Sequence, residues 1–93
     1  MFLGRVIGEV VSTIKHPSLV GRKILVVDRL TPDRRPVGTS TLALDSVDAG
    51  VGDFVLVIDE GSSAALVTGL PNPPIRTVIV GVVDQVDLEI PPA

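Results

Sequence analysis

Apolar residues along the chain gather into five runs, each bounded by glycine, proline or charged residues. The fourth run, Phe54–Ile58, is continuous between acidic residues, which is typical of a strand covered on both faces. Runs this rich in valine and isoleucine favour strands over helices. The pattern therefore predicts five β-strands, at Leu3–Thr13, Lys23–Arg29, Thr39–Leu44, Asp53–Ile58 and Thr77–Leu88.

The first and last of these strands carry further information. Gly4 and Gly8 interrupt the first strand, and because glycine weakens a strand, they indicate a bend, a bulge or a close approach of two backbones. The end of the last strand alternates, so we expect its polar side chains to face water and its apolar ones to face inward. The polar set is Gln85, Asp87 and Glu89, and the apolar set is Val86, Leu88 and Ile90.

Two segments of small residues flank the fourth strand. Ala49-Gly50-Val51-Gly52-Asp53 is a candidate structural turn, since glycine reaches backbone angles that other residues avoid. Gly61-Ser62-Ser63-Ala64 follows the strand, and such small side chains suggest that a ligand, another subunit or a symmetry axis approaches this backbone. Residues Ser62–Val67 are compatible with one short helical turn before the proline-rich segment Pro71–Pro74.

Five strands with glycine-rich bends predict a fold class. We expect an all-β protein, a five-stranded Greek-key, OB-like β-barrel with at most one short helical turn. The 93 residues make a single domain, 1–93. A small barrel of this kind has strand edges that need cover, and pairing with an adjacent copy is one way to cover them.

Composition narrows the possible partners. The chain is 45% hydrophobic but only 2% aromatic, so its core is built from aliphatic residues and it lacks a stacking platform for bases or sugars. A mean hydropathy of +0.52 indicates buried subunit contacts. The net charge of −3 argues against a nucleic-acid partner. No apolar run approaches the roughly 18–20 residues of a membrane helix, and with no signal-peptide pattern and no cysteine we expect a cytosolic protein.

Charge is distributed unevenly along the chain. Residues 1–43 contain seven basic and three acidic side chains, a balance of +4. Residues 44–93 contain one basic and eight acidic side chains, a balance of −7. Two arrangements would satisfy this asymmetry: pairing between the halves of one chain, or a head-to-tail ring in which the basic part of one subunit faces the acidic part of the next.

Patterns that support catalysis or cofactor binding are missing from the sequence. The single histidine, His16, lies in a predicted loop, and Ser62-Ser63 lack the Gly-x-Ser-x-Gly context of a serine nucleophile. Gly50-Val51-Gly52 lacks the third glycine of a dinucleotide-binding loop. Asp59-Glu60 is better explained as a solvated strand end than as a cation site, and the pair Arg34-Arg35 as an exposed loop. We therefore expect no catalytic residue, no cofactor and no metal site.

Six segments, in this order and at these separations, carry a resemblance to a known family. They are Leu3–Gly8, Leu19–Val27, Asp45–Asp53, Val55–Val57, Gly61–Ala64 and Ile79–Val86. Together they resemble the vertex proteins of bacterial microcompartments, the pentamer-forming shell family that includes the ethanolamine-utilisation and carboxysome vertex proteins. The resemblance covers nearly the whole chain. Two positions depart from the family pattern: Asp48 stands where the family usually has glycine, and Ala65 where it commonly has arginine.

The resemblance implies a structural role rather than catalysis. It implies an OB-like barrel that forms a homopentamer, caps the vertices of a polyhedral shell in the cytoplasm, and meets hexagonal tile proteins of the same shell along its rim. It also implies that Gly61, Ser62, Ser63 and Ala64 line a narrow opening on the five-fold axis. The alternatives are an OB-fold module that binds a ligand or nucleic acid and, third, a small β-barrel enzyme; homopentameric assembly would separate the shell protein from both.

Overall fold

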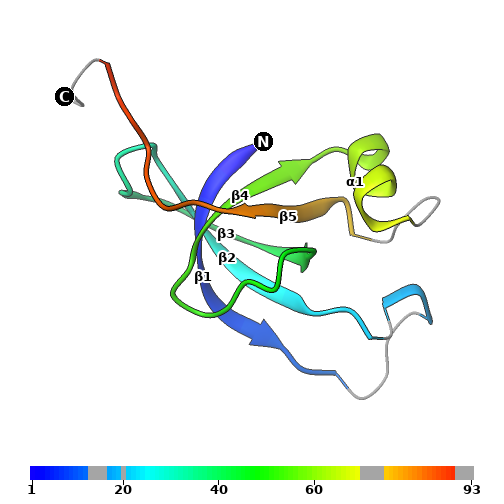
Figure 1. Ribbon diagram of the computed structural model, residues 1–93. Coiled ribbons are helices and arrows are strands. Elements are labelled where there is room, and N and C mark those ends of the chain that lie inside the picture. The colour runs from blue at the N-terminus through cyan, green and yellow to red at the C-terminus, as the bar shows by residue number, and fades with distance from the viewer. Residues whose placement is uncertain (13–16, 20, 70–74, 90–93) are drawn as a thin grey trace.

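The computed structural model describes residues 1–12, 17–19, 21–69 and 75–89, and strands form most of its regular structure (Figure 1). The strands are β1 (Phe2–Val10), β2 (Ile24–Leu30), β3 (Pro36–Asp45), β4 (Phe54–Asp59) and β5 (Thr77–Val82). A short 3-10 helix, η1 (Pro17–Leu19), precedes β2, and helix α1 (Gly61–Thr68) lies between β4 and β5. The helix extends one residue beyond the predicted turn at each end.

The five strands close into a barrel in the order β1-β2-β3-β5-β4, and β4 pairs in turn with β1. All neighbours are antiparallel except β3 and β5, which run parallel and meet at only two residue pairs, Leu44–Val78 and Asp45–Ile79. Because the chain reaches β4 before it returns to pair β5 with β3, this is the Greek-key order of an OB-like barrel. The predicted fold class is confirmed.

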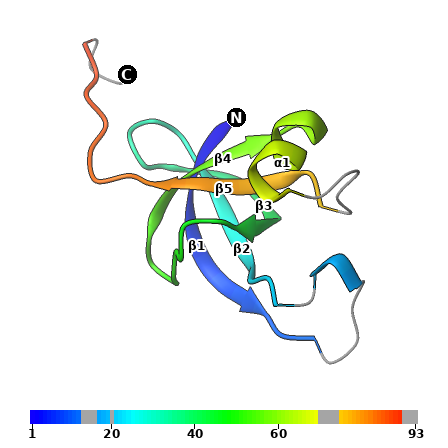
Figure 2. The same cartoon turned by 45° about the vertical axis from the view of Figure 1, so that its right-hand side comes forward.

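The interior of the barrel is aliphatic and falls into two clusters of buried residues. The larger consists of Phe2, Val6, Leu25, Val27, Ala43, Ala49, Val55, Val57 and Ile79. The smaller consists of Leu19, Ile24, Leu44, Ile58, Ala64 and Val78. Ala64 belongs to α1, so the helix packs against the end of the barrel where β4 ends and β5 begins (Figure 2).

Strand β1 bends where its two glycines predicted an irregularity. The register with β2 shifts between Val6 and Gly8, which leaves Ile7 without a partner and half exposed. Gly4 marks a close approach, because a Cβ atom at this position would lie 2.3 Å from Val27 Cγ1 and 2.9 Å from the Asp28 carbonyl oxygen. A bulge and a close approach let the strand curve around a narrow core.

The last strand is shorter than predicted. The alternating pattern predicted strand structure from Thr77 to Leu88, but β5 ends at Val82. The Val83 N–H donates to the carbonyl oxygen of Phe54, the first residue of β4, at 2.7 Å, so β4 offers no partner beyond this point. The predicted inward-facing positions are therefore wrong for Leu88, which is 45% exposed, while Ile90 lies outside the described residues.

The candidate structural turn, residues 49–53, connects β3 to β4 and is held at both ends. The Asp53 N–H donates to the Gly50 carbonyl at 3.0 Å, and the Gly50 N–H donates to the Asp53 carboxylate at 2.8 Å. Two further backbone bonds attach the turn to β1, from Gly52 N–H to the Val6 carbonyl at 2.8 Å and from Val6 N–H to the Asp53 carbonyl at 3.0 Å. Of the two glycines only Gly52 has a positive φ, 96°.

Replacing Gly4 with alanine tests the close approach of β1 to β2. We expect Gly4→Ala to lower the free energy of unfolding by about 1–3 kcal/mol, because the added methyl group overlaps a buried side chain and a carbonyl oxygen. The matched control is Gly8→Ala on the same strand, where the nearest atoms lie 3.8 Å from the added Cβ and the change should stay within about 0.5 kcal/mol. Urea unfolding at one fixed protein concentration measures both, and equal stabilities would contradict the close approach.

Replacing the two turn glycines separately tests which of them requires glycine. Gly52→Ala should destabilise the protein by about 1–2 kcal/mol, since alanine is strained at positive φ, and Gly52→Val should cost more and reduce assembly. Gly50→Ala is the control, because Gly50 has no positive φ and no atom within 4 Å of an added Cβ. Thermal melting measures all three variants. A lower melting temperature for Gly50→Ala than for Gly52→Ala would contradict the turn geometry.

Candidate functional site

The four small residues predicted to line an opening form the first turn of α1. The helix starts after Glu60, whose backbone is extended, and the Ala64 N–H donates to the Glu60 carbonyl at 3.0 Å. It ends at Gly69, which has a left-handed backbone with a φ of 73°. The Gly69 N–H donates to the Ala65 carbonyl at 2.9 Å and caps the helix. The side chains of Ser62 and Ser63 lie outside the described part of the structure.

The helix presents apolar residues in two directions. Ala64 is fully buried against the barrel, in the cluster that contains Leu44, Ile58 and Val78. Leu66, two residues later, is 86% exposed. Of the four small residues, Ala64 therefore directs its side chain into its own protomer, and any contribution that it makes to an opening comes from its backbone.

Aliphatic side chains are also exposed on the strands and loops around the barrel. Scattered exposed apolar residues are ordinary, but here they occur on β1, β3, β5 and α1 and in the loops, and Val11 and Leu66 are exposed by more than four-fifths. Those exposed by at least about a third are Met1, Ile7, Val10, Val11, Val37, Leu42, Val47, Val51, Leu66, Val67, Val82 and Leu88. A protein of 93 residues with these exposed apolar side chains can bury more apolar surface by packing against other chains.

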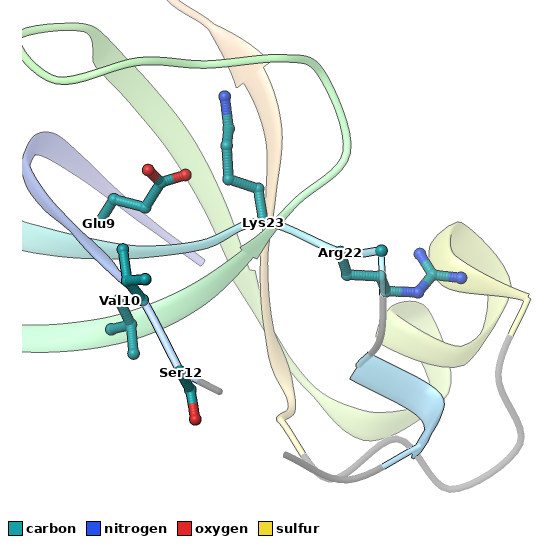
Figure 3. A pocket seen from close by; sticks show the side chains of 7 residues that line it. Glu9, Val10, Ser12, Arg22 and Lys23 are labelled. Atoms are coloured by element: carbon teal, nitrogen blue, oxygen red, sulfur yellow. The ribbon is translucent and has the colours of Figure 1, made fainter. Parts of the chain in front are cut away.

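A shallow hollow lies at the open end of the β1–β2 pair (Figure 3). Glu9, Val10, Val11 and Ser12 line it from β1 and the residues that follow, and Gly21-Arg22-Lys23 from the approach to β2. In Figure 3 the carboxylate of Glu9 and the ammonium of Lys23 extend above the strands, and the Arg22 side chain extends away from Glu9. The hollow is open to solvent and lacks the convergent polar groups of an enzyme pocket.

Lys23 joins the basic and acidic halves of the chain. Its Nζ lies 3.3 Å from Asp48 Oδ1 and 3.6 Å from Asp45 Oδ2. Burial alone would lower the pKa of Lys23, but hydrogen bonds and charge attraction from Asp48 and Asp45 outweigh it and raise that pKa. The Asp45 carboxylate also accepts the backbone N–H of Ala49 at 3.1 Å. At this position, pairing within one chain is observed, and the aspartates hold the turn rather than form an acid–base pair.

The arginines of the β2–β3 loop also have partners within the protomer. Arg34 lies 4.5 Å from the centre of the Phe54 ring and donates to the Asp84 carbonyl at 3.2 Å. Arg35 pairs with Asp33 at 2.6 Å. The Thr31 hydroxyl donates a hydrogen bond to the Asp33 carboxylate, and this bond lowers the pKa of Asp33 below its usual value. The charge of Arg35 lowers the pKa of Asp33 further. Neither arginine is arranged as an anion site.

The remaining chemical candidates find no support in the described residues. Among residues 1–12, 17–19, 21–69 and 75–89, no three histidine, cysteine or carboxylate side chains gather as metal ligands. Asp59 and Glu60 are exposed, and His16 lies outside this set. In the same residues no helix is both long enough and apolar enough to cross a membrane.

Known proteins resemble this chain along almost its whole length. The family model described as ethanolamine utilisation protein EutN/carboxysome matches residues 1–84. The bacterial microcompartment shell vertex protein GrpN of Rhodospirillum rubrum is 48% identical over 87 residues, which cover 94% of this chain and 97% of GrpN. The shell vertex protein PduN of Salmonella typhimurium is 48% identical over 88 residues, which cover 90% of this chain and 96% of PduN.

Solved structures agree with these relatives. The GrpN pentameric microcompartment shell protein from Rhodospirillum rubrum superposes with a TM-score of 0.83 at 45% identity, covering 95% of this chain and 99% of that one. CcmL of Gloeobacter violaceus superposes with a TM-score of 0.84 at 31% identity, covering 96% of this chain and 91% of that one. With one family model spanning residues 1–84 and relatives at 48% identity, this chain belongs to the EutN/CcmL family, to which the sequence resemblance pointed.

Proposed function

We propose that this protein is a structural shell protein whose homopentamers cap the vertices of a polyhedral bacterial microcompartment in the cytoplasm. The observation that carries the proposal is the 48% identity to GrpN along 94% of the chain, together with the shared fold of the pentameric GrpN structure. The related proteins are named as shell vertex proteins and not as enzymes, in agreement with a noncatalytic role. The exposed aliphatic residues provide apolar surface that the barrel can bury against its neighbours in such a ring.

A five-membered ring suits the geometry of a closed shell. A head-to-tail interface that closes after five steps gives a pentamer, and five-fold units close the corners of a layer tiled by hexagons. We propose that the rim of the ring meets the hexagonal tile proteins of the same shell through shape and polar contacts. We expect neither nucleic acid nor a membrane as a partner.

The structure adds a reason to prefer this role to an OB-fold module that binds nucleic acid. Such modules stack bases on exposed aromatic rings. The chain has two phenylalanines, Phe2 and Phe54, and both are buried in the barrel. Each ring is also covered by an arginine, Arg29 over Phe2 and Arg34 over Phe54. Neither ring is available to a base.

We further propose that Gly61, Ser62, Ser63 and Ala64 approach the five-fold axis. Small residues let five backbones converge without collisions between side chains. The support is their position in the first turn of a helix that packs on one end of the barrel, with Ala64 fixed in the core. In this arrangement the N-terminal turn of α1 from each protomer borders the opening.

The mass of the assembly in solution tests the pentamer directly. Native mass spectrometry should give five times the chain mass of 9.7 kDa at all but the lowest protein concentrations. Co-expression with hexagonal shell proteins should then give closed polyhedral particles by electron microscopy, and particles with open corners when this chain is omitted. A monomer or dimer over a wide concentration range, or saturable binding of oligonucleotides, would overturn the vertex role.

The size of the side chain at position 62 tests the axial placement. Ser62→Trp should reduce the pentamer fraction, because five indole rings would crowd the axis. Ser62→Ala should leave the mass of the assembly unchanged and the free energy of unfolding within about 0.5 kcal/mol of the parent. Native mass spectrometry and thermal melting report both variants. A full pentamer of unchanged stability with tryptophan at this position would show that the first turn of α1 lies away from the axis.

A further inference from the structure

We propose that Arg34 is a strap, a side chain that fastens the segment after β5, residues Val83–Glu89, to the β2–β3 loop. The strap sets the direction in which this segment leaves the barrel. It is a conformational device within one protomer, so it does not depend on the proposed vertex role. It gives a role to an arginine at a backbone position that is suited to glycine.

The β2–β3 loop is closed by its own hydrogen bonds. The Arg34 N–H donates to the Thr31 carbonyl at 2.9 Å, and the Thr31 N–H donates to the Arg35 carbonyl at 2.9 Å. These bonds enclose a loop of three residues, Pro32, Asp33 and Arg34. The Arg35 N–H also donates to the Thr31 hydroxyl at 3.1 Å. None of these bonds uses the Arg34 side chain, which is left to act outside the loop.

The backbone of Arg34 has the conformation that such a loop requires of its last residue. Its φ is 66°, in the left-handed region. A three-residue hairpin loop ends with a residue in that region, and glycine is the usual choice because it has no Cβ atom. Arginine at this position is strained, and strain of this kind points to a role for the side chain.

The Arg34 side chain contacts two other parts of the fold. Its Cζ atom lies 4.5 Å from the centre of the Phe54 ring, and its guanidinium donates to the Asp84 carbonyl at 3.2 Å. Phe54 begins β4 and is 5% exposed, so the ring is fixed in the core. The Val83 N–H donates to the carbonyl of the same Phe54 at 2.7 Å. One guanidinium therefore contacts the residue that accepts this bond and the residue that follows its donor.

The segment after β5 cannot continue along β4. Further pairing would need the backbone of the turn before Phe54, but β1 already uses it. The Gly52 N–H bonds to the Val6 carbonyl, and the Val6 N–H bonds to the Asp53 carbonyl. Within the described residues, no backbone bond joins residues 85–89 to the barrel. A side chain must therefore set the direction of the segment.

The direction that the segment takes is the one that Arg34 favours. In both Figure 1 and Figure 2 the orange-to-red segment runs from the end of β5 alongside the loop that joins β2 to β3. An open hollow lies between them, with Pro32 and Arg34 on the loop side and Gln85 and Val86 on the other. Arg34 joins the two sides of this hollow through its bond to the Asp84 carbonyl.

The second arginine over a phenylalanine provides an internal comparison. Arg29 lies 4.7 Å from the centre of the Phe2 ring, and Phe2 is also buried. This contact joins β2 to β1, which already pair along their length and include the pair Gly4–Arg29. The Arg29 contact therefore adds to an existing ladder, whereas the Arg34 contact joins two parts that no ladder connects.

Hydrogen exchange at single amides tests the strap. We expect Arg34→Asn and Arg34→Gly each to speed exchange of the Val83 amide by about three- to tenfold, because both remove the guanidinium beside its bond. Asparagine also adopts a left-handed backbone but leaves the loop stiffer than glycine does, so equal effects identify the side chain as the cause. The amides of Thr31 and of residue 34 should keep the protection of the parent, since their bonds do not involve the guanidinium.

Arg29→Ala is the matched control, because it removes the guanidinium over Phe2 and should leave exchange of the Val83 amide unchanged. Unchanged Val83 exchange in both Arg34 variants, acceleration by Arg34→Gly alone, or equal acceleration by Arg29→Ala would each overturn the strap. The unaltered protein gives a second measurement that needs no variant. Its nuclear Overhauser spectrum should contain cross-peaks between the Arg34 side chain and the Phe54 ring, and their absence would overturn the strap whatever the variants show.

Discussion

The position at which β4 begins is the constraint on which the rest of the barrel depends. Two backbone bonds between Val6 and the turn before β4 fix that position, and the positive φ of Gly52 lets the chain turn sharply enough to reach it. Because β4 starts at Phe54, β5 loses its partner at Val83 and the chain must leave the barrel there. The same bonds mark where β1 loses contact with the β4 side, so its last residues have a free edge. One turn thus determines both where the chain leaves the barrel after β5 and how much of β1 lacks a partner on its β4 side.

Much of this architecture could be predicted from residue patterns, because the patterns report burial. The continuous apolar run of β4 and the glycines of β1 correspond to a buried strand and to a bend with a close approach. The end of β5 could not be predicted, since alternation continues to Glu89 whether or not a neighbouring strand is present. An alternating pattern records which positions are apolar, but it does not record whether a neighbouring strand is present to pair with them.

Other features depend on spatial neighbours that no local pattern contains. Arg29 of β2 lies over Phe2, and Arg34 of the β2–β3 loop lies over Phe54. Because the partners in each pair are distant in sequence, no sequence pattern predicted these contacts. Asp48 is instructive, because the family usually has glycine there. Its φ of 59° lies in the region that favours glycine, and aspartate is among the few other residues that adopt it readily. Its carboxylate also contacts Lys23, which gives the substitution a compensating ion pair at the surface. No contact in the structure explains the other departure, Ala65.

The distribution of charge bears on which symmetry the free edges select. In a two-fold dimer that placed residues Val83–Glu89 of both copies against each other, three acidic residues from each copy would come together and repel. A head-to-tail contact avoids this repulsion, because it sets different surfaces of the two copies against each other. Part of the asymmetry between the +4 and −7 halves of the chain is satisfied within the protomer, where Lys23 pairs with Asp45 and Asp48. The acidic residues of the segment after β5 disfavour its pairing with the same segment of a second copy, and a head-to-tail rotation that closes a ring keeps these segments apart.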